Sequence, residues 1–84
     1  MLTLYQFNQL QPDERARCLW QSGRYLMSRH QIDGIAINLY WLDSFFVEVY
    51  YDGQAEQILT LRSFSSPNQL EPYLRYIRIK WNTN

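Results

Sequence analysis

The residue types that carry most enzyme chemistry are scarce in this sequence. Among 84 residues, His30 is the only histidine and Cys18 the only cysteine. Nucleophilic catalysis needs a base held beside the nucleophile, and no motif of that kind surrounds Cys18, His30 or Ser28. We therefore predict no catalytic residue. His30 is expected to be structural, and Cys18 is expected to be a small buried hydrophobe.

The same scarcity limits metal and redox chemistry. One cysteine cannot form an internal disulfide, and one Cys with one His cannot assemble a structural zinc site. We predict no metal site, no cofactor and a reducing compartment. The N-terminus lacks a signal-peptide pattern, and no apolar run approaches the ~18 residues that span a bilayer. A cytoplasmic protein without membrane contact is the expectation.

Glu48 is the one acidic residue in the middle of an apolar stretch. A carboxylate in such a place could act as an acid or a base if a suitable partner lay nearby. The neighbouring acids Asp33, Asp43 and Asp52 fall in predicted turns, where Asp bonds to the backbone. Glu48 is therefore expected to face solvent or to pair with Arg62 across a sheet.

Charge argues against nucleic acid as the partner. Eight basic and eight acidic residues cancel, so the molecule has no long-range field to attract phosphate. Residues 1–30 carry a net charge of +2, residues 31–64 carry −4, and residues 65–84 carry +2. Because the acidic middle region is the predicted sheet, its negative charge would repel a phosphate backbone that approached the exposed rings.

The N-terminal part predicts two helices. Thr3 and Gln6 have the spacing of a capping box, which predicts a short helix over 4–9. Pro12, followed by two acids that suit the positive end of a helix, predicts a second helix over 12–22. Gly23 is expected to end that helix in the left-handed conformation. The alternative is one helix that continues to His30.

Four strands are expected after Gly23, over 24–31, 35–42, 45–52 and 56–64. Turn pairs Asp-Gly, Asp-Ser and Asp-Gly begin at 33, 43 and 52, between runs rich in Ile, Val, Phe and Tyr. This spacing describes an antiparallel meander. A two-residue turn at 43–44 would pair Trp41 with Phe46 and place the apolar side of the second strand on the wrong face. We therefore predict an odd-length connection or a bulge near 42–46, which pairs Trp41 with Val47.

A C-terminal helix is expected to begin at Pro72, and residues 82–84 are expected to be frayed. No linker or repeat divides the chain. The fold class predicted is α+β, with residues 1–84 as one domain. It comprises a four-stranded antiparallel meander with the N-terminal helices and the C-terminal helix packed on one face.

Four segments resemble a group of short bacterial single-domain proteins of uncharacterised function. The segments are Leu4-Tyr5-Gln6-Phe7-Asn8-Gln9-Leu10, Leu19-Trp20-Gln21-Ser22-Gly23, Phe46-Val47-Glu48-Val49-Tyr50-Tyr51 and Leu70-Glu71-Pro72-Tyr73-Leu74. The resemblance spans most of the chain, from residue 4 to residue 74. The resemblance implies an independent bacterial protein and no particular activity.

Fourteen aromatic residues are enough to fill a small core and leave several rings on the surface. Helices on one sheet face would leave the other face uncovered, and such aromatic patches usually mark interfaces. We predict a non-enzymatic interaction module that self-associates or binds a protein. The candidate interface comprises Tyr40, Phe46, Glu48, Tyr50 and Arg62. The alternative is a small-ligand binder or small enzyme with a crevice near Glu48, Arg62 and Tyr50.

Overall fold

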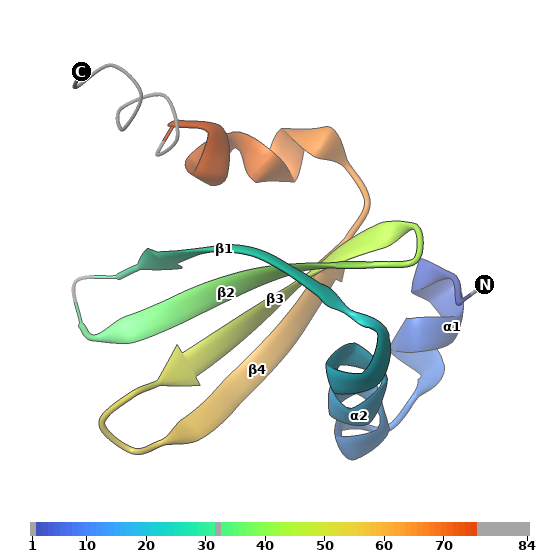
Figure 1. The fold of residues 1–84 in the computed structure, drawn as a ribbon, viewed down its shortest axis with the longest axis horizontal. Coiled ribbons are helices and arrows are strands. Elements are labelled where there is room, and N and C mark those ends of the chain that lie inside the picture. The colour runs from blue at the N-terminus through green and yellow to red at the C-terminus, as the bar shows by residue number, and fades with distance from the viewer. Residues whose placement is uncertain (1, 32, 76–84) are drawn as a thin grey trace.

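A computed structural model describes residues 2–31 and 33–75. The chain forms helix α1 (Leu4–Gln9), helix α2 (Pro12–Ser22) and strands β1 (Arg24–His30), β2 (Ile35–Leu42), β3 (Phe45–Asp52) and β4 (Gln57–Phe64). A 3₁₀ turn, η1 (Pro67–Leu70), then leads into a helical segment over 71–75. The four strands make one antiparallel sheet in the order β1-β2-β3-β4 (Figure 1). The predicted α+β class and meander are confirmed.

Both N-terminal helices have the predicted bounds, and α1 has the predicted capping box. The Thr3 hydroxyl accepts a hydrogen bond from the Gln6 amide, and the Gln6 side chain accepts one from the Thr3 amide. Pro12 opens α2 with Asp13 and Glu14 in its first turn, as expected. Gly23 ends α2, but it has an extended backbone with φ −76° and ψ 146°, so the predicted left-handed cap is wrong.

Residues 24–30 form a strand, which excludes the alternative of one helix continuing to His30. The reason for a glycine at position 23 is space. A Cβ atom there would lie 2.6 Å from the Leu19 carbonyl oxygen and 2.8 Å from Leu19 Cδ1, closer than van der Waals contact allows. The missing side chain lets the chain leave α2 directly into β1.

The connection between β2 and β3 differs from the prediction. A two-residue turn at Asp43 and Ser44 pairs Leu42 with Phe45 and Trp41 with Phe46, so the predicted pairing of Trp41 with Val47 is wrong. Asp43 takes the left-handed conformation, with φ 56°, which Asp tolerates better than most residues. The prediction assumed that only one face of the sheet is buried.

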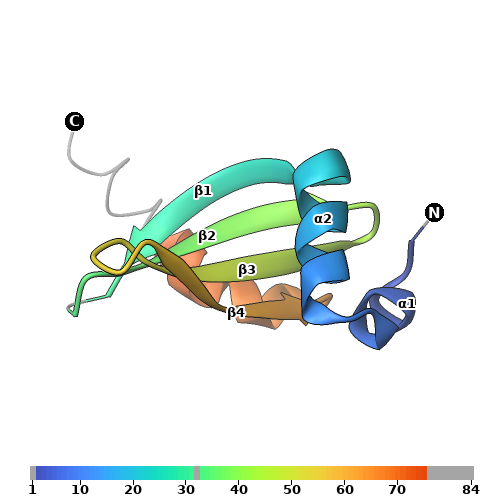
Figure 2. The ribbon, with the colours of Figure 1, turned by 90° about the horizontal axis from the view of Figure 1, so that it is seen from below.

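Helices cover both faces of the sheet. On the first face, α1 and α2 bury a core made of Phe7, Leu19, Leu42, Phe45, Val47 and Val49. On the second face, Tyr73 of the C-terminal segment packs with Leu39 and Phe64. Figure 2 shows α2 crossing the strands in front of the sheet and the C-terminal segment behind it. The expectation that all helices pack on one face is therefore wrong. Apolar side chains that point to either face of the sheet can be buried.

The C-terminal helix was predicted from Pro72, and the helical residues begin one position earlier, at Glu71. Pro72 is compatible with a helix here because it lies in the first turn. Tyr73 is 1% exposed, whereas Leu74 is 46% exposed, so one ring anchors this segment. The expected fraying of residues 82–84 lies outside the described residues.

Both edge strands contain a register irregularity that changes which side chains share a face. In β1 the register shifts between Tyr25 and Met27, so Leu26 has no partner on β2. In β4 it shifts between Ile58 and Thr60, so Leu59 has no partner on β3. Each is a β-bulge, in which one extra residue interrupts the alternation of side chains. Tyr25 therefore lies on the first face although Met27 and Arg29 lie on the second.

We predict that Gly23→Ala lowers the free energy of unfolding by about 1–3 kcal/mol, because the new methyl group overlaps the buried Leu19. Gly53→Ala is the matched control, since a Cβ atom there meets nothing within 4 Å. It should change stability by less than about 1 kcal/mol. Urea unfolding followed by tryptophan fluorescence measures both variants. Equal effects at the two positions would contradict the steric role of Gly23.

Candidate functional site

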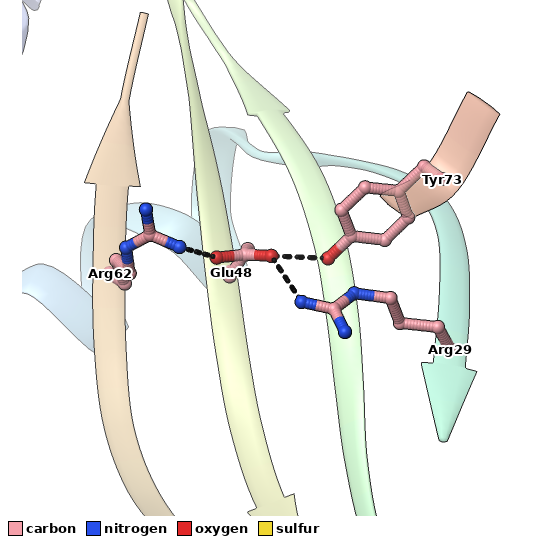
Figure 3. Close-up of polar contacts among 4 residues, drawn as sticks. All are labelled: Arg29, Glu48, Arg62 and Tyr73. Carbon is pink, nitrogen blue, oxygen red and sulfur yellow. Dashed lines mark hydrogen bonds and ion pairs between the residues drawn. The ribbon is translucent and has the colours of Figure 1, made fainter. Parts of the chain in front are cut away.

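Glu48 lies in the middle of β3 on the second face and is 1% exposed. Its carboxylate accepts three hydrogen bonds (Figure 3). Arg62 donates to Oε1 at 2.9 Å, Arg29 donates to Oε2 at 3.4 Å, and the Tyr73 hydroxyl donates to Oε2 at 2.6 Å. The predicted Glu48–Arg62 pair is confirmed. The alternative that Glu48 faces solvent is wrong, because the C-terminal segment and its ring cover this part of the sheet.

Three separate elements supply the donors to Glu48. Arg62 stands directly opposite on β4, where the antiparallel register pairs the two residues. Arg29 reaches from β1 across β2, and the bulge before Met27 is what turns it to the second face. Tyr73 comes from the segment that packs over the sheet. We call these four residues the Glu48 network.

The surroundings of the Tyr73 hydroxyl within the network keep it protonated. Burial raises the pKa of Tyr73 well above its usual value, the hydrogen bond to Glu48 raises it further, and Arg29 only partly offsets both. For Arg29, burial lowers the pKa, but the contacts with Tyr73 and Glu48 together raise it above the ordinary value. The Arg29 guanidinium also lies over the Tyr73 ring, 5.1 Å from its centroid. Tyr73 is therefore a hydrogen-bond donor at neutral pH.

The network connects parts of the fold and offers little free surface to a ligand. Each carboxylate oxygen already accepts a hydrogen bond, and the side chain is buried beneath the Tyr73 ring. A buried carboxylate is stable only when donors satisfy it. For a ligand to reach Glu48, the C-terminal segment would have to move away.

The five candidate interface residues do not lie on one surface. Phe46, Glu48, Tyr50 and Arg62 share the second face, where Phe46 and Tyr50 are half-buried. The Phe46 ring contacts Trp41 and Phe64, with centroids 4.9 and 5.4 Å away. Tyr40 lies on the first face instead, because the two-residue turn places it opposite Val47. The structure therefore separates Tyr40 from the other four.

Tyr40 belongs to a second group of rings, which we call the aromatic cluster: Trp20, Tyr25 and Tyr40. Trp20 and Tyr25 each meet the Tyr40 ring edge to face, with centroids 5.8 and 5.7 Å away. Trp20 is 53% exposed and Tyr25 is 55% exposed. Burial, with a contribution from Tyr25, raises the pKa of the half-buried Tyr40 hydroxyl. The cluster joins the end of α2 to β1 and β2.

Sequence reasoning missed Arg29, Tyr73, Trp20 and Tyr25. Alternation along β1 would place Tyr25 and Arg29 on the same face, and no residue between them marks a bulge. Tyr73 falls in the predicted C-terminal helix, which was expected on the face covered by the N-terminal helices, whereas its ring packs on the second face. Trp20 lies near the C-terminal end of α2. It meets Tyr40 only because of the direction in which α2 crosses the sheet, which the sequence does not reveal.

His30 and Cys18 belong neither to the Glu48 network nor to the aromatic cluster. His30 is exposed at the end of β1, and Cys18 is a half-buried free thiol that packs against the first-face core. Within residues 2–31 and 33–75, no three His, Cys, Asp or Glu side chains gather as a metal site would require. No helix in these ranges is long and apolar enough to cross a membrane.

Replacing Tyr73 with Phe tests the hydrogen bond to Glu48. We expect a loss of about 1–2 kcal/mol at neutral pH, because a carboxylate loses one donor. In the native protein the unfolded phenol loses its proton near pH ~10, whereas the folded one retains it to higher pH. The unfolded state then binds fewer protons than the folded state, so stability falls as pH rises above about 10.

The Tyr73→Phe variant should lack this part of the alkaline decline, so its stability should approach that of the native protein as pH rises. Urea unfolding at a series of pH values from neutral to strongly alkaline measures the difference. Tyr5→Phe is the control, because it removes a hydroxyl from a side chain that is 74% exposed. Parallel curves for the native protein and Tyr73→Phe would contradict the proton assignment.

The chain was compared with protein-family models, with curated proteins and with solved structures, and none of them matched. The Glu48 network and the aromatic cluster are the features from which a function can be proposed. The network connects elements inside the fold, whereas the aromatic cluster faces outward.

Proposed function

We propose that this protein is a non-enzymatic cytoplasmic interaction module that binds another protein through the aromatic cluster. The observation that carries the proposal is the exposure of Trp20 and Tyr25 around a half-buried Tyr40. Tryptophan and tyrosine dominate the energetically important positions of protein interfaces. A large apolar ring that is half exposed gains burial when a partner covers it.

The cluster is pre-organised for binding. Tyr40 holds both neighbouring rings by edge-to-face contacts, and the Tyr25 hydroxyl lies 2.7 Å from Ser28 Oγ. Rings already held in place lose little conformational freedom on association, so more of the contact energy appears as affinity. Leu26, in the β1 bulge next to Tyr25, is 43% exposed and adds apolar surface.

Arg17 suggests the chemistry of the partner. It lies one helical turn before Trp20, whereas Arg24 stands opposite Trp41 and so belongs to the second face. Arg17 is exposed, and among the described residues it takes part in no ion pair. We infer a protein partner with an apolar or aromatic centre and acidic residues around it, since charges at a rim govern specificity and association rate.

The second sheet face is a weaker candidate for the same function. Phe46 and Tyr50 remain partly accessible there, but Glu48 is buried and Arg62 is paired with it. The small-ligand alternative near Glu48, Arg62 and Tyr50 has less support, because Tyr73 and the two arginines already bind the carboxylate. A partner on this face would compete with the C-terminal segment.

A photo-crosslinking amino acid at position 25 tests the proposal in the source cell. It should form a covalent product with one protein, which mass spectrometry identifies. With that protein purified, Trp20→Ala should weaken binding by about 2 kcal/mol or more, because a central ring is lost. Binding of the native protein should also weaken with added salt, since the Arg17 contact is screened.

Tyr5→Ala is the matched control, because Tyr5 is 74% exposed on α1 and lies outside the cluster. It should bind the partner as the native chain does. The proposal fails if position 25 yields no product. It also fails if Trp20→Ala, still folded by circular dichroism, binds with native affinity.

A further inference from the structure

The outer edge of β4 is open. β4 is the last strand of the sheet, and no described strand pairs with its outer side. Proteins often protect such an edge with charged side chains, proline or a β-bulge, and β4 has a bulge at Leu59 but few charges. β1, the other edge, carries Arg24, Arg29 and His30, whereas β4 carries only Arg62, whose side chain pairs with Glu48. Ile58 and Leu59 on β4 are 41% and 52% exposed.

A groove follows this edge on the first face. It has a volume of about 370 Å³ and lies between the first turn of α2 and β4. Its walls combine apolar and charged side chains: Pro12, Asp13, Arg15, Ala16, Ile58, Leu59, Thr60 and Leu61. In Figure 2 the beginning of α2 lies at the β4 side of the sheet, and its end lies at the β1 side. The groove and the aromatic cluster are therefore at opposite edges.

The charges in the groove do not satisfy each other. Arg15 Nε is buried and has no hydrogen-bond partner. Asp13 lines the same groove, but residues two apart on a helix point in different directions. Glu14 is engaged at its own helix end, where its Oε1 accepts a hydrogen bond from the Gln11 amide. Among the described residues Arg15 takes part in no ion pair, so its guanidinium can pair with an external carboxylate.

We propose that a second copy of this chain occupies the β4 edge, with the two β4 strands antiparallel about a two-fold axis. A two-fold interface needs a surface that is complementary to itself. This groove meets that condition, because it presents one anion and one cation: Asp13 of each copy would pair with Arg15 of the other. The exposed Ile58 and Leu59 would be covered by the same contact.

The dimer would join two four-stranded sheets into one continuous sheet. The two aromatic clusters would then lie at its outer edges, free to bind separate partners. The inference goes beyond the proposed function, because it uses another edge and another partner. Two linked binding sites would raise the apparent affinity for a partner with repeated sites.

Sedimentation equilibrium of the purified chain tests the proposal. A dimer has twice the 10.2 kDa chain mass. Asp13→Arg and Arg15→Asp should each weaken dimerisation about tenfold or more, because like charges then meet across the axis. The double variant Asp13→Arg/Arg15→Asp should restore it, since the exchanged charges pair again. A merely structural role of either residue predicts no such rescue.

Leu59→Lys tests the edge itself and should give a monomer that keeps the native circular dichroism spectrum. Tyr25→Ala, at the opposite edge, is the control and should stay dimeric. The proposal is overturned if the native chain is monomeric at all accessible concentrations. It is also overturned if Tyr25→Ala dissociates the dimer while Leu59→Lys does not, or if the charge exchange fails to rescue it.

Discussion

The buried carboxylate of Glu48 is the constraint around which the second face is organised. A charge that is 1% exposed must be matched by donors, and the chain draws them from β1, β4 and the C-terminal segment. Tyr73 also covers the carboxylate, because its ring packs on Leu39 and Phe64. One side chain thus connects two edge strands and a terminal segment that would otherwise have few reasons to meet.

A β-bulge in each edge strand determines which of its side chains lie on the first face and which on the second. In β1, the bulge sends Tyr25 to the first face and Arg29 to the second. In β4, it places Ile58 with the α2 groove while Arg62 points to Glu48. Without these extra residues, strict alternation would place Tyr25 on the same face as Arg29, and Ile58 on the same face as Arg62. The internal network and the two proposed binding edges therefore depend on the same irregularities.

Local signals were enough to predict much of the fold. Helix caps and turn pairs depend on residues that are neighbours in the sequence. The predicted bounds of the helices and strands agree with the structure within one residue. The Glu48–Arg62 pair was also predictable, since it follows from strands adjacent in sequence. Local signals did not predict three other features: the β2–β3 register, the face of the C-terminal segment and the location of Tyr40. Each depends on what covers the second face, which no local pattern contains.

A double-mutant cycle between Glu48 and Tyr73 tests the central claim most directly. The free energy of unfolding is measured for the native chain, Glu48→Gln, Tyr73→Phe and the double variant. If the carboxylate holds the C-terminal segment through this hydroxyl, the two single losses should exceed the loss of the double variant by about 1 kcal/mol or more. Losses that add within about 0.3–0.5 kcal/mol would show that the two groups act independently and would contradict the account.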